Sequence, residues 1–156
     1  MKLSIRLAKS KEELQQVLKI RETVFIKGQN VPLELELDGL NEESKHVIAK
    51  YGDKPVGTAR IRFHGDRVKV ERLAVLESHR GIGIGKRTLK YVINYCRRKG
   101  FKEVVLHAQY YAKGFYEKLG FRPRGKIFME ANIEHIEMYL PLGRIQSKSG
   151  KQGTIV

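Results

Sequence analysis

The chain alternates between stretches with the two-residue period of strands and stretches with the longer period of helices. The residues Ser10-Lys11-Glu12-Glu13 have the form of a capping box and predict the start of a helix. Apolar residues then recur at helical spacing, at Leu14, Val17, Leu18, Val24 and Phe25. Further helices are predicted from about Gly83 to Gly100 and from Tyr111 to Leu119.

Strand character appears in short segments bounded by turn residues: Leu3 to Ala8, His46 to Tyr51, Val56 to Phe63, Arg67 to Leu76, Glu103 to Ala108, Arg124 to Met129 and Glu134 to Leu140. The strands between His46 and Leu76 are joined by tight turns, which predicts an antiparallel meander. Residues 70 to 108 instead run strand, loop, helix, strand, which predicts parallel neighbours. The pattern therefore predicts an α/β fold with a mixed central β-sheet.

The segment from Val70 to Lys86 reads V-E-R-L-A-V-L-E-S-H-R-G-I-G-I-G-K, so an apolar strand passes into a glycine-spaced loop that opens a helix. Backbone N–H groups at a helix N-terminus favour an anion, and Arg80 and Lys86 add positive charge beside it. The glycines between them lack the Cβ atoms that would hold a pyrophosphate away from the main chain. The loop is therefore a predicted phosphate site.

Two familiar phosphate loops do not fit this spacing. A P-loop continues from its Gly-Lys pair into Ser or Thr, whereas Arg87 follows Lys86 here. A dinucleotide-binding loop has the form G-x-G-x-x-G near the first strand of the chain, whereas this loop reads G-x-G-x-G and lies in mid-chain.

The loop does resemble the Arg/Gln-x-x-Gly-x-Gly/Ala signature of the GNAT superfamily of N-acetyltransferases, with Arg80, Gly83 and Gly85 at the fixed positions. Downstream, the residues from Ala112 to Phe121 read A-K-G-F-Y-E-K-L-G-F and resemble a second motif of that superfamily in the expected order. Similarity to the ElaA-like branch extends over roughly residues 1 to 142, including Gly57-Thr58-Ala59-Arg60.

The resemblance implies the GNAT acyl-CoA N-acyltransferase fold, in which the strand ending at Val75 and the strand ending near Gln109 splay apart to receive the pantetheine arm of acetyl-CoA. It implies acetyl-CoA as cosubstrate and no metal. The cofactor-binding residues would be Leu73, Ala74, Val75, Arg80, Gly81, Ile82, Gly83, Ile84, Gly85, Lys86 and Gln109. Gln109 stands where the superfamily often has Asn, and it is otherwise a polar residue that ends a strand.

Two residues are candidates for catalysis. By resemblance, Tyr116 is the tyrosine whose hydroxyl points at the CoA sulfur, and a phenol that is protonated at neutral pH suits a proton donor. The alternative is that Tyr116 only packs on the sheet. Glu71 lies on the strand that leads to the site and would act as base, while the alternative is a structural ion pair with Arg60 or Arg72.

A concentrated acidic segment follows the first helix and contains Glu34, Glu36, Asp38, Glu42 and Glu43. On a basic protein such a segment would attract a cationic amine acceptor. It is equally compatible with a solvated loop.

Composition narrows the function classes. The 156 residues suit one domain, predicted here as residues 1 to 142, with a flexible tail over 143 to 156. The formal charge of +14, from 31 Lys and Arg and 17 Asp and Glu, raises a noncatalytic CoA-binding or nucleic-acid-binding module as the alternative. The basic residues are spread along the chain without aromatic interleaving, which disfavours nucleic acid.

The remaining expectations concern surroundings and partners. The apolar runs are too short to cross a bilayer, and no signal-peptide core is evident, so a cytoplasmic enzyme without membrane association is expected. The single cysteine, Cys96, shares a helical face with Leu89, Val92 and Ile93 and is expected to be buried. A homodimer is compatible with the sequence, and the amine acceptor and the acyl-chain preference stay open.

Overall fold

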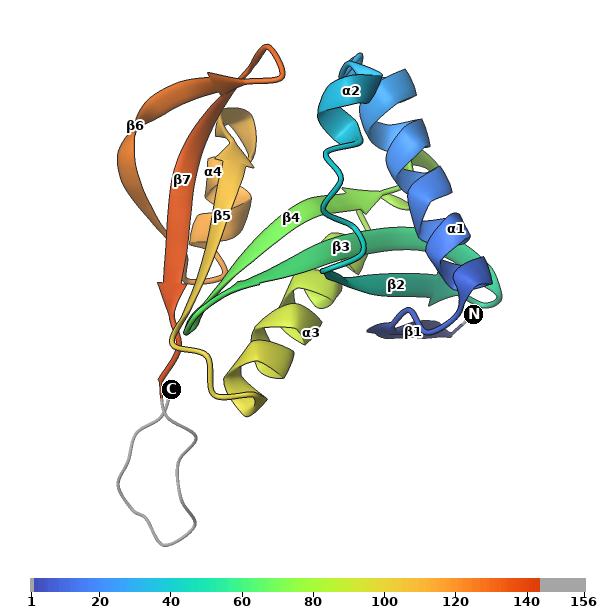
Figure 1. Cartoon of the computed structure of the whole chain (residues 1–156), viewed down its shortest axis with the longest axis horizontal. Helices are drawn as coiled ribbons and strands as arrows, with labels where there is room; N and C mark the ends of the chain where they lie inside the picture. Colours follow the sequence, from blue (N-terminus) through green and yellow to red (C-terminus); the bar gives the residue numbers. More distant parts are fainter. Residues whose placement is uncertain (1, 144–156) are drawn as a thin grey trace, which may run out of the picture. The chain divides into compact units, whose positions relative to one another are not determined.

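The computed structural model describes residues 2–143 and contains seven strands, in the order β1-β2-β3-β4-β5-β7-β6 (Figure 1). The chain divides into two compact units. Among the described residues, the first comprises 2–62 together with 70–92, and the second comprises 63–69 and 93–143.

Antiparallel strands form the sheet of the first unit. These strands are β1 (Leu3–Leu7), β2 (Lys45–Tyr51), β3 (Lys54–His64) and β4 (Arg67–Val75). In the register, Ile5 lies opposite Ala49 on β2, and Ala49 lies opposite Gly57 on β3. The register shifts between Ala49 and Lys50, which is a bulge at the hairpin end of β2.

Helix α1 (Lys11–Arg21) lies across the strands of this sheet in Figure 1 and continues as a π-helical turn, η1 (Glu22–Lys27). The predicted N-cap is confirmed, because the Ser10 hydroxyl oxygen accepts a hydrogen bond from the Glu13 N–H at 3.1 Å. The Glu13 carboxylate, however, accepts from the Lys9 N–H at 2.9 Å and pairs with Arg6. This contact replaces the Ser10 N–H contact of a standard capping box.

The core of the first unit has two apolar clusters. In one cluster, Ile20 and Val24 of the helical segment pack against Ala74 of β4. In the other, Ala49 and Val56 pack against Ile84, and Val75 also joins this group. Because successive strand residues point to opposite faces, Ala74 and Val75 place the two clusters on opposite sides of β4.

The long helix α3 (Ile84–Arg98) ends in a glycine turn, as predicted. Gly100 adopts a φ of 86°, and the Phe101 N–H donates to the Cys96 carbonyl at 3.1 Å, which is the pattern of a Schellman cap. Phe101 stacks on Phe63 at a centroid distance of 5.3 Å. Cys96 is fully buried, which confirms the expectation for its thiol.

The second unit contains β5 (Glu103–Gln109), β6 (Arg122–Glu130) and β7 (Ile133–Pro141), with β7 antiparallel to both of the others. A short 3-10 turn, η3 (Tyr110–Ala112), leads into α4 (Lys113–Glu117), which packs against β5 and β6. The register of β6 on β7 shifts between Arg124 and Phe128, around Gly125 with its φ of 84°.

The predicted α/β class with a mixed sheet is confirmed, and all seven strands fall where the sequence places them. Two local differences stand out. The predicted helix over 111–119 begins as a 3-10 turn and has only five α-helical residues, and the acidic loop contains a short helix, α2 (Leu33–Glu36). The predicted tail lies outside the described residues, apart from Gly143. Within residues 2–143, no helix has both the length and the apolar character required to cross a membrane.

Candidate functional site

The glycine loop between β4 and α3 has the backbone conformation that an anion site requires. Gly81 and Gly83 have φ values of 82° and 89°, in the left-handed region that side chains with a Cβ rarely adopt. A Cβ added at either position would find no atom within 4 Å, so the space beside the backbone is open. The glycines therefore shape the loop and leave its surface accessible.

The start of α3 presents N–H groups that the helix itself does not use. The first backbone bond into the helix runs from the Arg87 N–H to the Gly83 carbonyl at 3.0 Å, so the N–H groups of Ile84, Gly85 and Lys86 precede the helical ladder. The Ile84 side chain is buried against Ala49 and fixes this end of α3 in the core. Ile84 can therefore contribute only backbone atoms to a ligand.

Arg80 connects the loop to the end of β4. Its Nε donates a hydrogen bond to the Val75 carbonyl oxygen at 2.9 Å. Leu76, which follows Val75, donates its N–H to the Val56 carbonyl at 2.8 Å. This bond holds the end of β4 on β3. Ile82 on the loop and Lys86 in the first turn of α3 are exposed. The backbone and side chains predicted for the phosphate site thus come together.

The second predicted motif surrounds Tyr116, whose side chain is half-buried. Gly120 has a φ of 98° and ends the helical segment, and the Phe121 N–H donates to the Tyr116 carbonyl at 3.1 Å in a second Schellman cap. The Phe121 ring then packs edge-on against the Tyr116 ring at 6.0 Å. The Leu-Gly-Phe part of the motif therefore fixes the position of the tyrosine.

Burial, with a smaller contribution from Tyr111, raises the pKa of Tyr116 to about 12. The phenol is therefore fully protonated throughout the neutral range. A proton donor must carry its proton before the reaction begins, and Tyr116 meets that condition.

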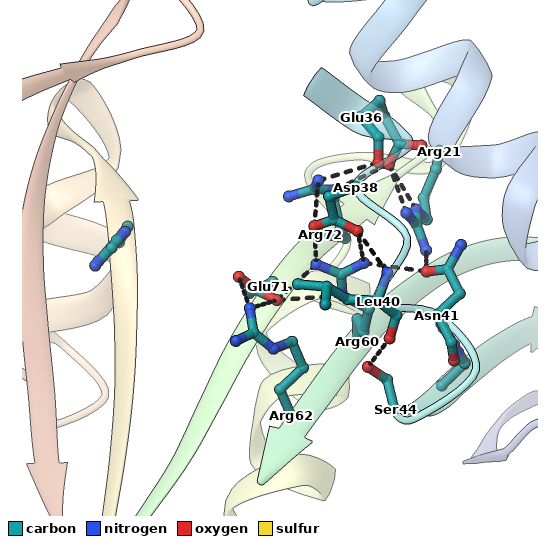
Figure 2. A network of polar contacts seen from close by, with 12 residues as sticks. Arg21, Glu36, Asp38, Leu40, Asn41, Ser44, Arg60, Arg62, Glu71 and Arg72 are labelled. Atoms are coloured by element: carbon teal, nitrogen blue, oxygen red, sulfur yellow. Dashed lines mark hydrogen bonds and ion pairs between the residues drawn. The ribbon is translucent and has the colours of Figure 1, made fainter. Parts of the chain in front are cut away.

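Glu71 lies in a network of arginines and acids in the first unit (Figure 2). Its Oε1 accepts hydrogen bonds from Arg60 Nη2 at 2.7 Å and Nε at 3.2 Å, and Arg62 Nη1 lies 3.2 Å from Oε2. Of the two ion pairs foreseen for Glu71, the pair with Arg60 is confirmed. Arg72 instead contacts Glu36 and Asp38.

Two of the five acids in the acidic segment, Glu36 and Asp38, are paired with arginines. Glu36 is buried, and its Oε2 lies 2.7 Å from Arg21 Nη2 and 2.9 Å from Arg72 Nε. Asp38 binds Arg60 through both of its carboxylate oxygens, at 2.6 and 2.9 Å. Although partial burial opposes it, the hydrogen bonds from Arg60 hold the pKa of Asp38 well below its usual range. Glu34, in contrast, is exposed.

Arg72 adopts a left-handed backbone conformation within β4, with a φ of 56°. Such a conformation is strained for a residue with a Cβ. The side chain compensates, because its Nη2 donates to the carbonyls of Leu35 and Glu36 at 3.1 Å each. Regular strand alternation would place Glu71 on the same face as Leu73 and Val75, and Arg72 interrupts that alternation next to Glu71.

Gln109 ends β5, opposite His135 of β7. On the same strand, His107 lies between two carboxylates, with Nδ1 3.4 Å from Glu130 Oε1 and Nε2 3.7 Å from Glu137 Oε1. His135 is buried, and its Nδ1 donates to the Ile133 carbonyl at 2.7 Å. Both histidines therefore have partners within the second unit.

The predicted site residues divide between the two units. The glycine loop and Glu71 belong to the first unit, and Gln109 and Tyr116 belong to the second. The sequence interpretation missed the part played by Arg21 and Asn41, and it foresaw Arg60 as a partner of Glu71 but not of Asp38. A signal was present for Arg21, which lies on the same helical face as Val17 and Val24, where a charged residue requires a partner. The polar network itself depends on contacts far apart in the chain.

Comparison with known proteins identifies the family of this chain. Residues 8–142 match the family model described as the acetyltransferase (GNAT) domain. The chain belongs to the GNAT superfamily, and it is an N-acetyltransferase, as predicted.

The chain is 41% identical over 133 residues to the uncharacterised N-acetyltransferase YjcF of Bacillus subtilis, covering 85% of this chain and 95% of that protein. It is 30% identical to the ElaA protein of Escherichia coli over 134 residues, which covers 83% and 88% of the two chains. The crystal structure of Escherichia coli ElaA matches with a TM-score of 0.79 at 27% identity, over 89% of this chain and 99% of that chain. The predicted resemblance to the ElaA-like branch is thus confirmed.

A Bacillus subtilis acetyltransferase, crystallised in complex with CoA, has the same fold. It matches with a TM-score of 0.70 at 19% identity, over 90% of this chain and 99% of that chain.

Proposed function

We propose that this acetyltransferase moves the acetyl group of acetyl-CoA directly to a primary amine, with both substrates bound at once. The new bond joins the amine nitrogen to the acetyl carbonyl carbon, and the bond from that carbon to sulfur breaks. One proton leaves the amine and one proton reaches the sulfur, so the products are an amide and free CoA. Neither a metal nor a covalent enzyme intermediate is needed for this balance.

The observation that carries the proposal is the loop from Gly81 to Lys86. Its left-handed glycines leave the backbone open, and the N–H groups at the start of α3 precede the helical ladder. These features fit a pyrophosphate, since backbone donors at a helix N-terminus favour phosphate groups. A solved neighbour with this fold is described as a complex with CoA, which supports the same assignment.

The residues named for the cofactor divide by the atoms they offer. Leu73, Ala74 and Val75 would offer backbone groups, one N–H of which would stabilise the developing oxyanion. Arg80 and Lys86 would add positive charge, and Gln109 would bond the amide-bearing arm.

Tyr116 would give its proton to the sulfur, and Glu71 would accept the proton of the amine, directly or through water. Because Arg60 and Arg62 favour the ionised form of Glu71, a proton that it accepts is soon passed on to solvent. The predictions of a cytoplasmic location and of a single domain over 1 to 142 stand beside this proposal as expectations from the sequence, with which a homodimer is compatible.

The test is a screen of amine acceptors that follows free thiol released from acetyl-CoA. The panel contains polyamines, amino sugars, peptides with free N-termini and lysine-containing proteins. We expect acetyl-CoA binding in calorimetry and thiol release that depends on one acceptor class. Binding of CoA without release for any amine would favour the noncatalytic alternative.

The nucleic-acid alternative rests only on the charge of +14. It predicts tight binding of DNA or RNA that weakens steeply with salt. Titrations of a DNA duplex and of CoA at two salt concentrations separate the two functions.

A further inference from the structure

Arg60 is one of two fully buried arginines of the polar network, the other being Arg21, and 0% of its surface is exposed. Its neighbours on β3, Ala59 and Ile61, are equally buried. A guanidinium in such surroundings is costly unless each of its donors is paired. The position of Arg60 therefore needs an explanation beyond packing.

The pairing is complete. Nε and one N–H of Nη2 donate to Glu71 Oε1, at 3.2 and 2.7 Å. The other N–H of Nη2 donates to Asp38 Oδ2 at 2.6 Å. Nη1 donates to Asp38 Oδ1 at 2.9 Å and to Asn41 Oδ1 at 3.1 Å. Every guanidinium N–H has an acceptor, so the side chain is held rigidly between the two carboxylates.

We propose that Arg60 is a positioning residue for the acetyl transfer, because its guanidinium fixes and keeps ionised the Glu71 carboxylate that takes the proton of the amine. The inference rests on the proposed role of Glu71 as base. Arg60 itself touches neither substrate in this account and acts through Glu71 alone.

The charges around Glu71 determine the direction of each expected effect. Arg60 and Arg62 face Glu71 from β3, and Asp38 faces the same Arg60 from the other side. Arg72 follows Glu71 on β4 and turns its side chain to Glu36 and Asp38. Removing a guanidinium favours protonation of Glu71, whereas removing the Asp38 charge disfavours it.

The experiment is the pH profile of kcat at saturating substrates for the parent and five variants. The acidic limb of this profile is the fall of kcat at low pH, where the base is protonated. If Glu71 is the base, Glu71→Gln should abolish this limb. Arg60→Gln should move the limb to higher pH by about one to three units, the range of an arginine beside a carboxylate. Asp38→Asn should move it to lower pH.

The fourth variant is Arg124→Lys, which disturbs a partly exposed ion cluster with Glu103 and Glu137 in the second unit. It should leave the limb in place. Arg60→Lys completes the comparison, because lysine keeps the charge but cannot span both carboxylates. We expect it to lower kcat by about tenfold through lost orientation, with a smaller shift of the limb. CoA affinity and melting temperature confirm that each variant is folded.

The outcomes are distinct. Opposite shifts for Arg60→Gln and Asp38→Asn support the inference, since a purely structural role would lower stability without moving the limb. If Glu71→Gln removes the limb but neither variant moves it, Arg60 is not a positioning residue and the role of Glu71 stands. If Glu71→Gln retains the limb, Glu71 is not the base. If Arg60→Gln does not fold, the profile of Asp38→Asn decides: a limb at lower pH supports the inference, and an unmoved limb overturns it.

Discussion

The Arg21 guanidinium and the Glu36 carboxylate lie 2.7 Å apart with side-chain exposures of 1% and 4%. Burial lowers the pKa of Arg21, and the charge of Glu36 acts against that effect. The pair joins α1 to the short helix α2, so a contact between residues distant in sequence holds the acidic segment in place. A buried charge that loses its partner destabilises a protein strongly.

Replacing Glu36 should therefore affect stability first. We expect Glu36→Gln to lower the free energy of unfolding by about 3–5 kcal/mol, because it leaves Arg21 buried without an anion. The exposed Glu34 on the same helix is the matched control, and Glu34→Gln should change stability by less than about 0.5 kcal/mol. Urea denaturation measures both, and similar small effects would show that the buried pair contributes little.

Replacing Gly83 should weaken cofactor binding. A valine at the φ of 89° strains the loop and fills the space that a pyrophosphate would approach. Gly65→Val is the control, because Gly65 has a φ of 62° in the turn between β3 and β4 and likewise has open space. We expect both variants to lose about 1–2 kcal/mol of stability. Only Gly83→Val should lose CoA affinity in calorimetry, and unchanged affinity in that variant would remove the loop from the site.

Removing the hydroxyl of Tyr116 should slow the chemical step. Tyr116→Phe keeps the ring that packs on Phe121, so kcat should fall on the order of 100-fold while CoA affinity stays nearly constant. Tyr111→Phe removes a hydroxyl from an exposed side chain nearby and should leave kcat unchanged. Thiol release at the parental rate in Tyr116→Phe, measured where chemistry limits turnover, would reduce Tyr116 to a packing residue.

His46 should make stability depend on pH. Burial lowers its pKa below the ordinary value of 6.5, although the contact with the Asn41 carbonyl opposes this. As the pH decreases below about 6.5, the His46 imidazole is protonated in the unfolded chain before it is protonated in the folded protein. The free energy of unfolding therefore falls over that range. Denaturation at pH 7.5 and 5.5 should show a smaller difference for His46→Gln than for the parent. His64→Gln, at an exposed histidine, is the control and should show the same difference between the two pH values as the parent. If the parent, His46→Gln and His64→Gln all show the same difference, His46 is not the source of the pH dependence.

The sequence predicted the local features of this fold because they have local causes. The helix that ends at Gly100 and the motif that ends at Gly120 and Phe121 each depend on a glycine with positive φ and the residue after it. The phosphate loop is likewise contained in a few consecutive residues. Such patterns are visible without knowledge of the tertiary structure.

The arginine network could not be derived in the same way. Arg60 and Asp38 are far apart in the chain, and nothing local shows that one guanidinium binds both Asp38 and Glu71. The charge count suggested a negative segment in a basic protein, yet Glu36 and Asp38 are neutralised by arginines from α1, β3 and β4. The helix α2 was also missed, because its four residues are too few for a periodic signal.

The burial of Cys96 has a practical consequence for measuring this enzyme. Its thiol is the only one in the chain, it is fully inaccessible, and burial raises its pKa to about 12. Reagents that detect thiols react with the accessible thiolate, so the folded protein should add almost no background colour to an assay of released CoA. Denaturing a sample of known concentration then exposes one thiol per chain. The thiol that reacts only after denaturation gives the fraction of protein that was folded.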